Sequence, residues 1–231
     1  MGIIPKTTIL EFNGLPGVGK STITQYLGDL AKKYEIPFYK TYYRHSFDRR
    51  AISLLLRPSI LFLLPSILRF AYGYRGGVQK YRYVTGFLAY IREYLDFQRD
   101  IKNGLLVADQ GLIQDFISIA HDSIIHDVGM VSSIMSKVEK YNIRFIRIDC
   151  DLSEEEVLFR LRRRENGGSR IEKNIDTEVK RLLSVQKNNL FSLRHELNTL
   201  PYTSHISIDA SVSPFDNASK IWDIVYGKSE K

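Results

Sequence analysis

The chain alternates short apolar runs with stretches in which apolar residues recur at helical spacing. The apolar runs predict strands at 7–13, 38–43, 105–108, 144–149 and 205–209. Helical patterns predict helices at 21–34, 79–102, 112–141 with a break near 127–129, from Ser153, 173–197 and 214–226. Strands that alternate with helices in this way predict a single α/β domain over 1–231, with three layers and a five-stranded parallel sheet.

A glycine-rich loop joins the first strand to the first helix. It comprises Gly14, Leu15, Pro16, Gly17, Val18, Gly19, Lys20, Ser21 and Thr22. This is the P-loop pattern in its strand–loop–helix context, where backbone N–H groups and the helix N-terminus bind phosphates. In this pattern Lys20 contacts the phosphates and Ser21 ligates Mg²⁺. We therefore predict a P-loop NTPase fold that binds a nucleotide, in preference to a glycine-rich turn with a solvated lysine.

Polar residues follow two other predicted strands, at the sheet edge where ligands of parallel sheets bind. Asp109 directly follows the wholly apolar run 105–108, which suits a Mg²⁺ ligand or a catalytic base. The alternative is a cap for the next helix. Arg44 and Asp48 follow the second strand and are candidates for binding a second substrate; the alternative is a solvated loop.

The segment 51–72 is mostly apolar and nearly as long as the roughly 20 residues of a membrane span. Arg57, Pro58, Pro65 and Arg69 interrupt it, which is costly in lipid. Three interpretations stay open: helices packed in the fold or in a dimer interface, contact with a membrane surface, and a membrane span.

Arginines gather after the fourth strand. Ser153 and Glu156 form a capping-box pattern that begins a helix. Five arginines lie in this helix and in the Gly-Gly loop after it: Arg160, Arg162, Arg163, Arg164 and Arg170. They would suit a mobile lid that neutralises a transferring phosphate. The alternative is a basic, solvated helix face.

Composition narrows the class of partner. The formal net charge of +7 fits anionic phosphate substrates. No nucleic acid is expected, since no helix-turn-helix, zinc or RNA-binding pattern occurs. Cys150 is the single cysteine, which excludes an intramolecular disulfide. Together with the lack of a signal-like N-terminus, it favours a cytoplasmic location.

The whole chain resembles the P-loop nucleoside and nucleotide kinases, and thymidylate kinases most closely. The resemblance rests on Ile9–Thr22, on Leu105–Gly111, on the lid-like segment at 151–172 and on the strand end at 206–215. It implies ATP and Mg²⁺ as co-substrates and often a homodimer. It also implies phosphate-binding roles for Arg160, Arg164 and Arg170, an adenine-side position for Asp209 and Ala210, and an acceptor-phosphate role for Arg92.

The acceptor side departs from this family. Gln110 stands where the family has an arginine that contacts phosphate, Gly111 replaces a tyrosine, and Gln114 replaces a serine. We therefore expect an ATP-dependent kinase with a small-molecule acceptor, a nucleoside monophosphate first. The alternatives are a P-loop kinase for a sugar or a membrane-proximal metabolite, and a non-catalytic nucleotide-binding switch protein.

Overall fold

The computed structural model describes residues 7–41, 63–75, 77, 79–101, 103–139, 145–163, 176–200 and 204–227. The strands are β1 (Thr8–Asn13), β2 (Phe38–Lys40), β3 (Leu105–Ala108), β4 (Ile146–Asp151) and β5 (Ser204–Asp209). The helices are α1 (Lys20–Lys33), α4 (Leu64–Tyr72), α5 (Gln79–Asp100), α6 (Leu112–Ala120), α7 (Val128–Glu139), α8 (Glu154–Arg162), α9 (Asp176–Leu197) and α10 (Pro214–Tyr226).

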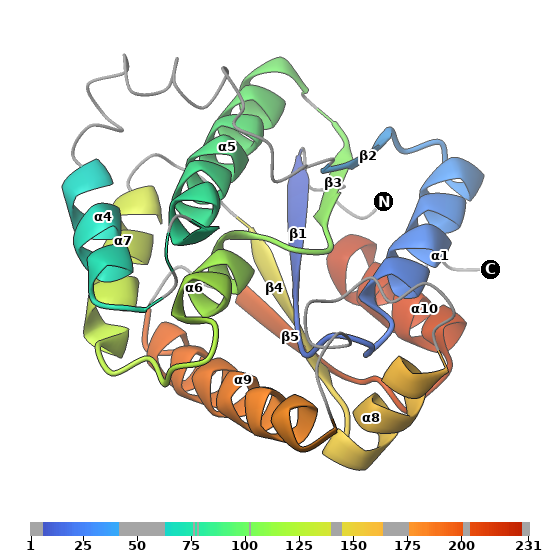
Figure 1. Cartoon of the computed structure of the whole chain (residues 1–231). Helices are drawn as coiled ribbons and strands as arrows, with labels where there is room; N and C mark the ends of the chain where they lie inside the picture. The colour runs from blue at the N-terminus through green and yellow to red at the C-terminus, as the bar shows by residue number, and fades with distance from the viewer. Residues whose placement is uncertain are drawn as a thin grey trace.

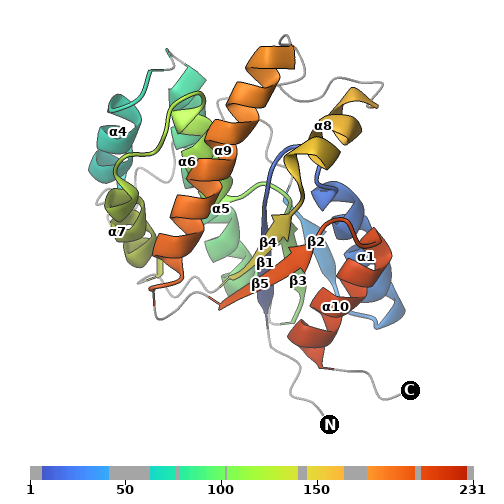
Figure 2. The same cartoon turned by 90° about the horizontal axis from the view of Figure 1, so that it is seen from below.

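The five strands form one parallel sheet in the order β2-β3-β1-β4-β5. β1 and β3 are buried along their whole length, as expected for central strands covered on both faces. Helices α1 and α10 cover one face, while α5, α6 and α9 cover the other, with α4 and α7 outside them (Figures 1 and 2). The predicted three-layer α/β/α P-loop NTPase fold is thus confirmed.

Most predicted elements lie within two or three residues of those observed. The largest shift is in the helix predicted over 112–141 with a break near 127–129: α6 already ends at Ala120, where His121 has φ +50°, and α7 begins at Val128. A smaller shift is in β4, which runs to Asp151, two residues beyond the predicted end at Asp149. The strand continues because Cys150 and Asp151 pair with Ile208 and Asp209 of β5. Within the strand, the buried charges of Arg147 and Asp149 are paired, since Arg147 Nε contacts the Asp149 carboxylate at 3.0 Å. The extension to Asp151 depends on pairing with β5, which lies far away in the sequence.

The described part of the apolar segment is a packed helix. Residues 51–62 of it lie outside the described residues, whereas Leu64–Tyr72 form α4. Ile67, Phe70 and Ala71 are buried, and α4 contacts α5 and α7. Among the described residues, no helix is both long and apolar enough to cross a membrane. The prediction of helices packed in the fold therefore holds for α4.

Candidate nucleotide and phosphate site

The P-loop lies at the carboxyl edge of the sheet, between β1 and α1. Gly14 must be small because a Cβ there would lie 2.9 Å from the Cys150 carbonyl oxygen. Gly19 has φ +95°, a left-handed conformation that favours glycine, and is the N-cap of α1. It offers no side chain to cap the first N–H groups of this helix. Such a helix start suits an anion.

The Lys20 side chain folds back over this loop. Its ammonium group donates to the carbonyl oxygens of Gly14 at 2.7 Å and Leu15 at 3.0 Å. These contacts hold a positive charge above the loop that would bind the phosphates. The contact of Lys20 with phosphates stays a prediction.

Three side chains from three elements meet at one carboxylate oxygen next to the loop. Ser21 Oγ donates to Asp109 Oδ2 at 2.9 Å, and Lys40 Nζ lies 2.9 Å from the same oxygen. Ser21 lies in the first turn of α1, Asp109 follows β3, and Lys40 ends β2. Asp109 does not cap α6, because the N-cap of that helix is Gly111. The alternative interpretation of Asp109 as a helix cap is therefore wrong, and its role as a Mg²⁺ ligand or catalytic base stays a prediction.

Ser21 and Asp109 together suit a magnesium ion. A hydroxyl and a carboxylate oxygen are the hard donors that Mg²⁺ prefers, and Mg²⁺ usually completes its shell with water and substrate phosphates. The described ranges contain no group of three or more His, Cys, Asp or Glu that could hold a metal by themselves. The two oxygen donors fit Mg²⁺ by their chemistry.

A buried glutamate fixes the segment that carries Asp109. Glu11 of β1 is fully buried, and its Oε1 accepts the N–H of Ile113 at 2.9 Å. Its Oε2 accepts the hydroxyl hydrogen of Tyr94 at 3.1 Å. A Cβ on Gly111 would lie 2.2 Å from Glu11 Cδ. Glu11 therefore takes the place of a helix cap for α6 and explains the glycine at 111.

Burial raises the pKa of Glu11 to about 7, although hydrogen bonds from the backbone at Ile113 and Leu112 and from Tyr94 oppose the shift. Burial also raises the pKa of Glu93 to about 7. The pKa of Asp115 lies well above its ordinary value because of burial and the nearby Glu11 charge. The folded protein thus holds protons on these carboxyls that the unfolded chain would release.

We expect the free energy of unfolding to fall as pH rises from about 5 to 8. Because the folded pKa of Glu11 is raised, its contribution to stability is present at low pH and is lost as pH passes through 7. A shift from 4.5 to about 7 corresponds to about 3 kcal/mol for this fully buried group. Urea unfolding at pH 5 and at pH 8 measures this decrease in the free energy of unfolding. In Glu11→Gln the decrease should be smaller than in the wild type by roughly this amount. The exposed Glu155→Gln should behave like the wild type; equal pH dependence in Glu11→Gln would contradict the assignment.

Arg160 links α8 to the end of β5. Its Nη2 donates to the Ala210 carbonyl oxygen at 3.1 Å, and its Nε pairs with Glu156 at 2.9 Å. A Cβ on Gly19 would lie 3.8 Å from Arg160 Nη1, so the guanidinium is beside the loop. Asp209 Oδ1 accepts the N–H and hydroxyl of Ser211, which lowers the pKa of Asp209. The structure thus brings together the loop at Gly19, Arg160 of α8 and the end of β5 at Ala210.

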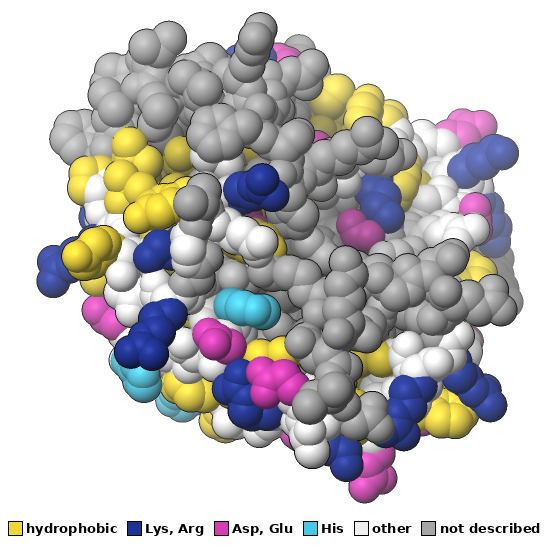
Figure 3. All heavy atoms as spheres, in the orientation of Figure 1, with side chains coloured by type: hydrophobic (Ala, Val, Ile, Leu, Met, Phe, Trp, Pro, Cys, Tyr) yellow, Lys and Arg dark blue, Asp and Glu magenta, His cyan; other side chains and the backbone are white. Residues whose placement is uncertain are grey.

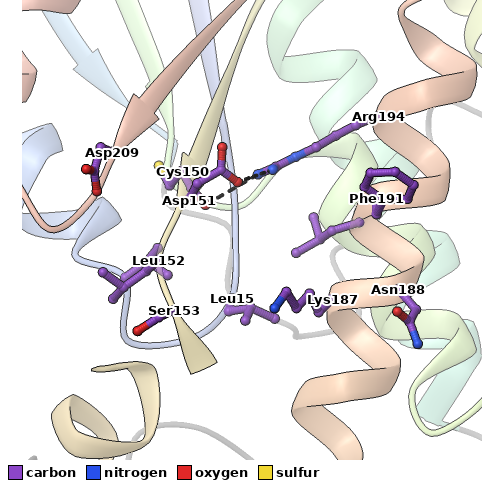
Figure 4. Close-up of a pocket in the computed structure, with 12 residues that line it drawn as sticks. Leu15, Cys150, Asp151, Leu152, Ser153, Lys187, Asn188, Phe191, Arg194 and Asp209 are labelled. Carbon is purple, nitrogen blue, oxygen red and sulfur yellow. Dashed lines mark hydrogen bonds and ion pairs between the residues drawn. The ribbon is translucent and has the colours of Figure 1, made fainter. Parts of the chain in front are cut away.

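Arg194 of α9 contacts the carboxyl ends of β1 and β4 beside the loop. Its guanidinium forms ion pairs with Asp149 and Asp151 and donates to the carbonyl oxygens of Asn13 and Cys150. The ion pair with Asp151 crosses the pocket drawn in Figure 4. These contacts fix α9 against the end of β4 and against the end of β1, after which the P-loop begins.

The pocket beside the loop has a volume of about 490 Å³. Its lining includes Leu15 and Val18 of the loop, the end of β4 and the Phe191 side of α9 (Figure 4). Burial raises the pKa of the Cys150 thiol to about 12, so this lining residue is a poor nucleophile. The pocket gives the loop an open flank of the size of a small-molecule site.

No contact with the P-loop is described for the remaining predicted residues. Arg44, Asp48, Arg164 and Arg170 lie outside the described residues. Arg92 of α5 pairs with Asp96 at 3.2 Å, one turn along the same helix. Gln110 is exposed next to Asp109. Gln114, in the first turn of α6, has a buried Oε1 that finds no hydrogen-bond partner among the described residues.

Three functional or supporting residues were missed in the sequence: Lys40, Glu11 and Arg194. Lys40 is the last residue of a strand whose carboxyl end faces the site, and this position was a usable signal. A glutamate within an otherwise apolar strand was a second signal. Nothing local marked Arg194, which lies in a long helix rich in polar residues.

Basic side chains on the face shown in Figure 3 are scattered among acidic and polar ones. The described lysines and arginines do not gather there into one stripe of the kind that binds nucleic acid.

Comparisons with known proteins give remote structural likenesses. No protein-family model matches the chain, and no curated protein matches it. A shikimate kinase from Acinetobacter baumannii, solved in complex with shikimate, is 14% identical with a TM-score of 0.45, over 99% of this chain and 98% of that one. EHV4-TK complexed with TP4A is 13% identical with a TM-score of 0.46, over 95% of this chain and 90% of that one. The interpretation of the site therefore rests on its geometry.

Proposed function

We propose that this protein is an ATP-dependent phosphotransferase that moves the γ-phosphate to a small acceptor. The observation that carries the proposal is the convergence of Lys20, Ser21 and Asp109 at a glycine-rich loop and a helix N-terminus. Phosphoryl transfer needs positioning and charge stabilisation more than covalent chemistry, so this set of groups is chemically sufficient.

Each group has a distinct task in this proposal. The N–H groups of the loop and of α1 bind the donor phosphates, and Lys20 screens their charge. Ser21 and Asp109 would hold Mg²⁺, directly or through water, and the bound ion would supply further charge neutralisation. Arg160 lies between the loop and the β5 end, where it can contact the phosphates or the base. Arg164 and Arg170 are proposed to act with it.

The first candidate acceptor is a nucleoside monophosphate, as the resemblance to thymidylate kinases suggests. Gln110 and Gly111 differ from that family. Glu11 accounts for the glycine at 111, because a side chain there would collide with the Glu11 carboxyl group. The glycine at 111 therefore reflects packing and gives no information about the acceptor. A sugar or another metabolite stays the alternative acceptor because Gln110 and Gln114 carry no charge.

A coupled ADP-release assay over nucleoside monophosphates, nucleosides and sugars tests the proposal. We expect turnover with one class of acceptor and none with a Lys20→Ala blank. ATP binding without a phosphorylated product across the panel would instead support a nucleotide-binding switch protein. No ATP binding at all would remove the proposal.

A further inference from the structure

The lysine at the end of β2 has no task in the function proposed above. β2 alternates its side chains between the two faces of the sheet. The Phe38 ring lies against α1, since a Cβ on Gly28 would be 3.2 Å from it, whereas Tyr39 packs on Phe97 of α5 at 5.4 Å between ring centroids. Lys40 therefore shares the α1 face with Phe38, one pleat closer to the carboxyl edge. This register carries its ammonium group to the N-terminus of α1.

At that point Lys40 shares its contact with the proposed metal ligands. Its Nζ lies 2.9 Å from Asp109 Oδ2, the same oxygen that accepts the Ser21 hydroxyl at 2.9 Å. The side chains of Lys40 and Asp109 are 30% and 20% exposed. Both side chains thus keep contact with solvent, which weakens their ion pair relative to a fully buried one. The contact is thus better suited to an exchangeable partner than to a structural bridge.

A divalent ion at Ser21 and Asp109 would lie within a few ångströms of this ammonium group. A doubly charged ion is repelled by it twice as strongly as a single charge at the same distance. Lys40 and the ion also compete for the same carboxylate oxygen. Both cannot hold Asp109 in the arrangement that the structure shows.

We propose that Lys40 substitutes for the divalent cation: it neutralises Asp109 while no metal is bound, and it gives up this contact when the metal binds. The inference rests on the proposed role of Ser21 and Asp109 as metal ligands. It follows that the protein alone binds the ion weakly. The phosphates of a nucleotide then supply the additional negative charge that favours the ion over Lys40. Metal and nucleotide would accordingly bind together rather than in sequence.

Binding of Mn²⁺ to the nucleotide-free protein, followed by electron paramagnetic resonance, tests this directly. In Lys40→Met we expect an affinity for Mn²⁺ about tenfold or more above that of the wild type, because a repelling charge and a competitor are removed. Lys40→Arg, which keeps the charge, should stay close to the wild type. Lys32→Met removes an exposed lysine at the far end of α1 and is the matched control.

The double variant Lys40→Met, Asp109→Asn should lose the gained affinity, which would locate the ion at Asp109. Circular dichroism and thermal unfolding of each variant show that it is folded before the titration. Equal affinities of wild type and Lys40→Met, including no detectable binding by either, would overturn the inference. The titration contains no acceptor, so its result is separate from that of the ADP-release assay. If the protein shows no turnover but Lys40→Met binds Mn²⁺ more tightly than the wild type, only the kinase assignment is contradicted.

Discussion

Replacing Lys20 by alanine should lower the rate of ATP-dependent phosphoryl transfer by about 10³-fold or more. The ammonium group is held above the loop by the Gly14 and Leu15 carbonyl oxygens, where it would face the phosphates on which charge builds up. Its removal takes away a charge that acts in the transition state, and no other described part of the loop supplies one. The stability cost is small by comparison, about 1–3 kcal/mol for hydrogen bonds made by a charged donor.

Steady-state kinetics and urea unfolding of the same variant separate these two effects. Lys32→Ala removes a lysine of the same helix at its exposed end and should keep full turnover. Full activity of Lys20→Ala, with the protein folded, would show that the loop is not a phosphate site for catalysis. An inactive variant that also fails to fold would be followed by Lys20→Met, which keeps most of the side-chain volume.

Substituting Gly111 by alanine should destabilise the protein by about 3 kcal/mol or more. The added Cβ would lie 2.2 Å from Cδ, 2.3 Å from Cγ and 2.5 Å from Oε2 of Glu11. Glu11 cannot move away cheaply, since it is fully buried and hydrogen-bonded to Ile113 and Tyr94. The backbone at 111 is extended, with φ −139°, so the expected cost comes from the clash and not from backbone strain.

Urea unfolding monitored by circular dichroism measures this cost. Gly129→Ala in α7 is the matched control: within the described part of the chain, a Cβ there would meet only Asp127 Oδ1, at 3.7 Å, and alanine favours a helix. We expect this control to be neutral or slightly stabilising. Shortening the glutamate in Glu11→Ala, Gly111→Ala should recover part of the loss, because it removes the atoms in conflict. A stability of Gly111→Ala equal to that of the wild type would disprove the proposed contact.

Local sequence signals were enough for the fold and for naming candidates on the donor side of the site. The P-loop, the apolar run before Asp109 and the capping pattern at Ser153 are each contained in a short stretch of chain. The helix cap is confirmed, since Ser153 Oγ accepts the N–H of Glu156 at 3.2 Å, and the candidates Ser21 and Asp109 lie within hydrogen-bond distance of each other. Such motifs depend only on residues that are near one another in the sequence. Once the order of strands and helices is known, their place at the carboxyl edge of the sheet follows.

The contacts that support the site depend on residues far apart in the chain. Glu11 meets the start of α6, Lys40 meets Asp109, and Arg194 meets the ends of β1 and β4. Each pairing requires the register of the parallel sheet, which hydrophobic periodicity does not give. Charged residues in buried strands, such as Glu11 and Arg147, also run against the rule that places charges outside. Their partners become visible only in three dimensions.

The close packing of Glu11 against Gly111 has an evolutionary consequence. Position 111 cannot acquire a side chain while Glu11 is present, and Glu11 cannot be lost without leaving the N–H of Ile113 unpaired in the core. A side chain as large as tyrosine at position 111 is therefore out of reach by single, individually tolerated changes. Any route to it passes through an intermediate of lower stability, so the two positions should vary together among descendants of this chain.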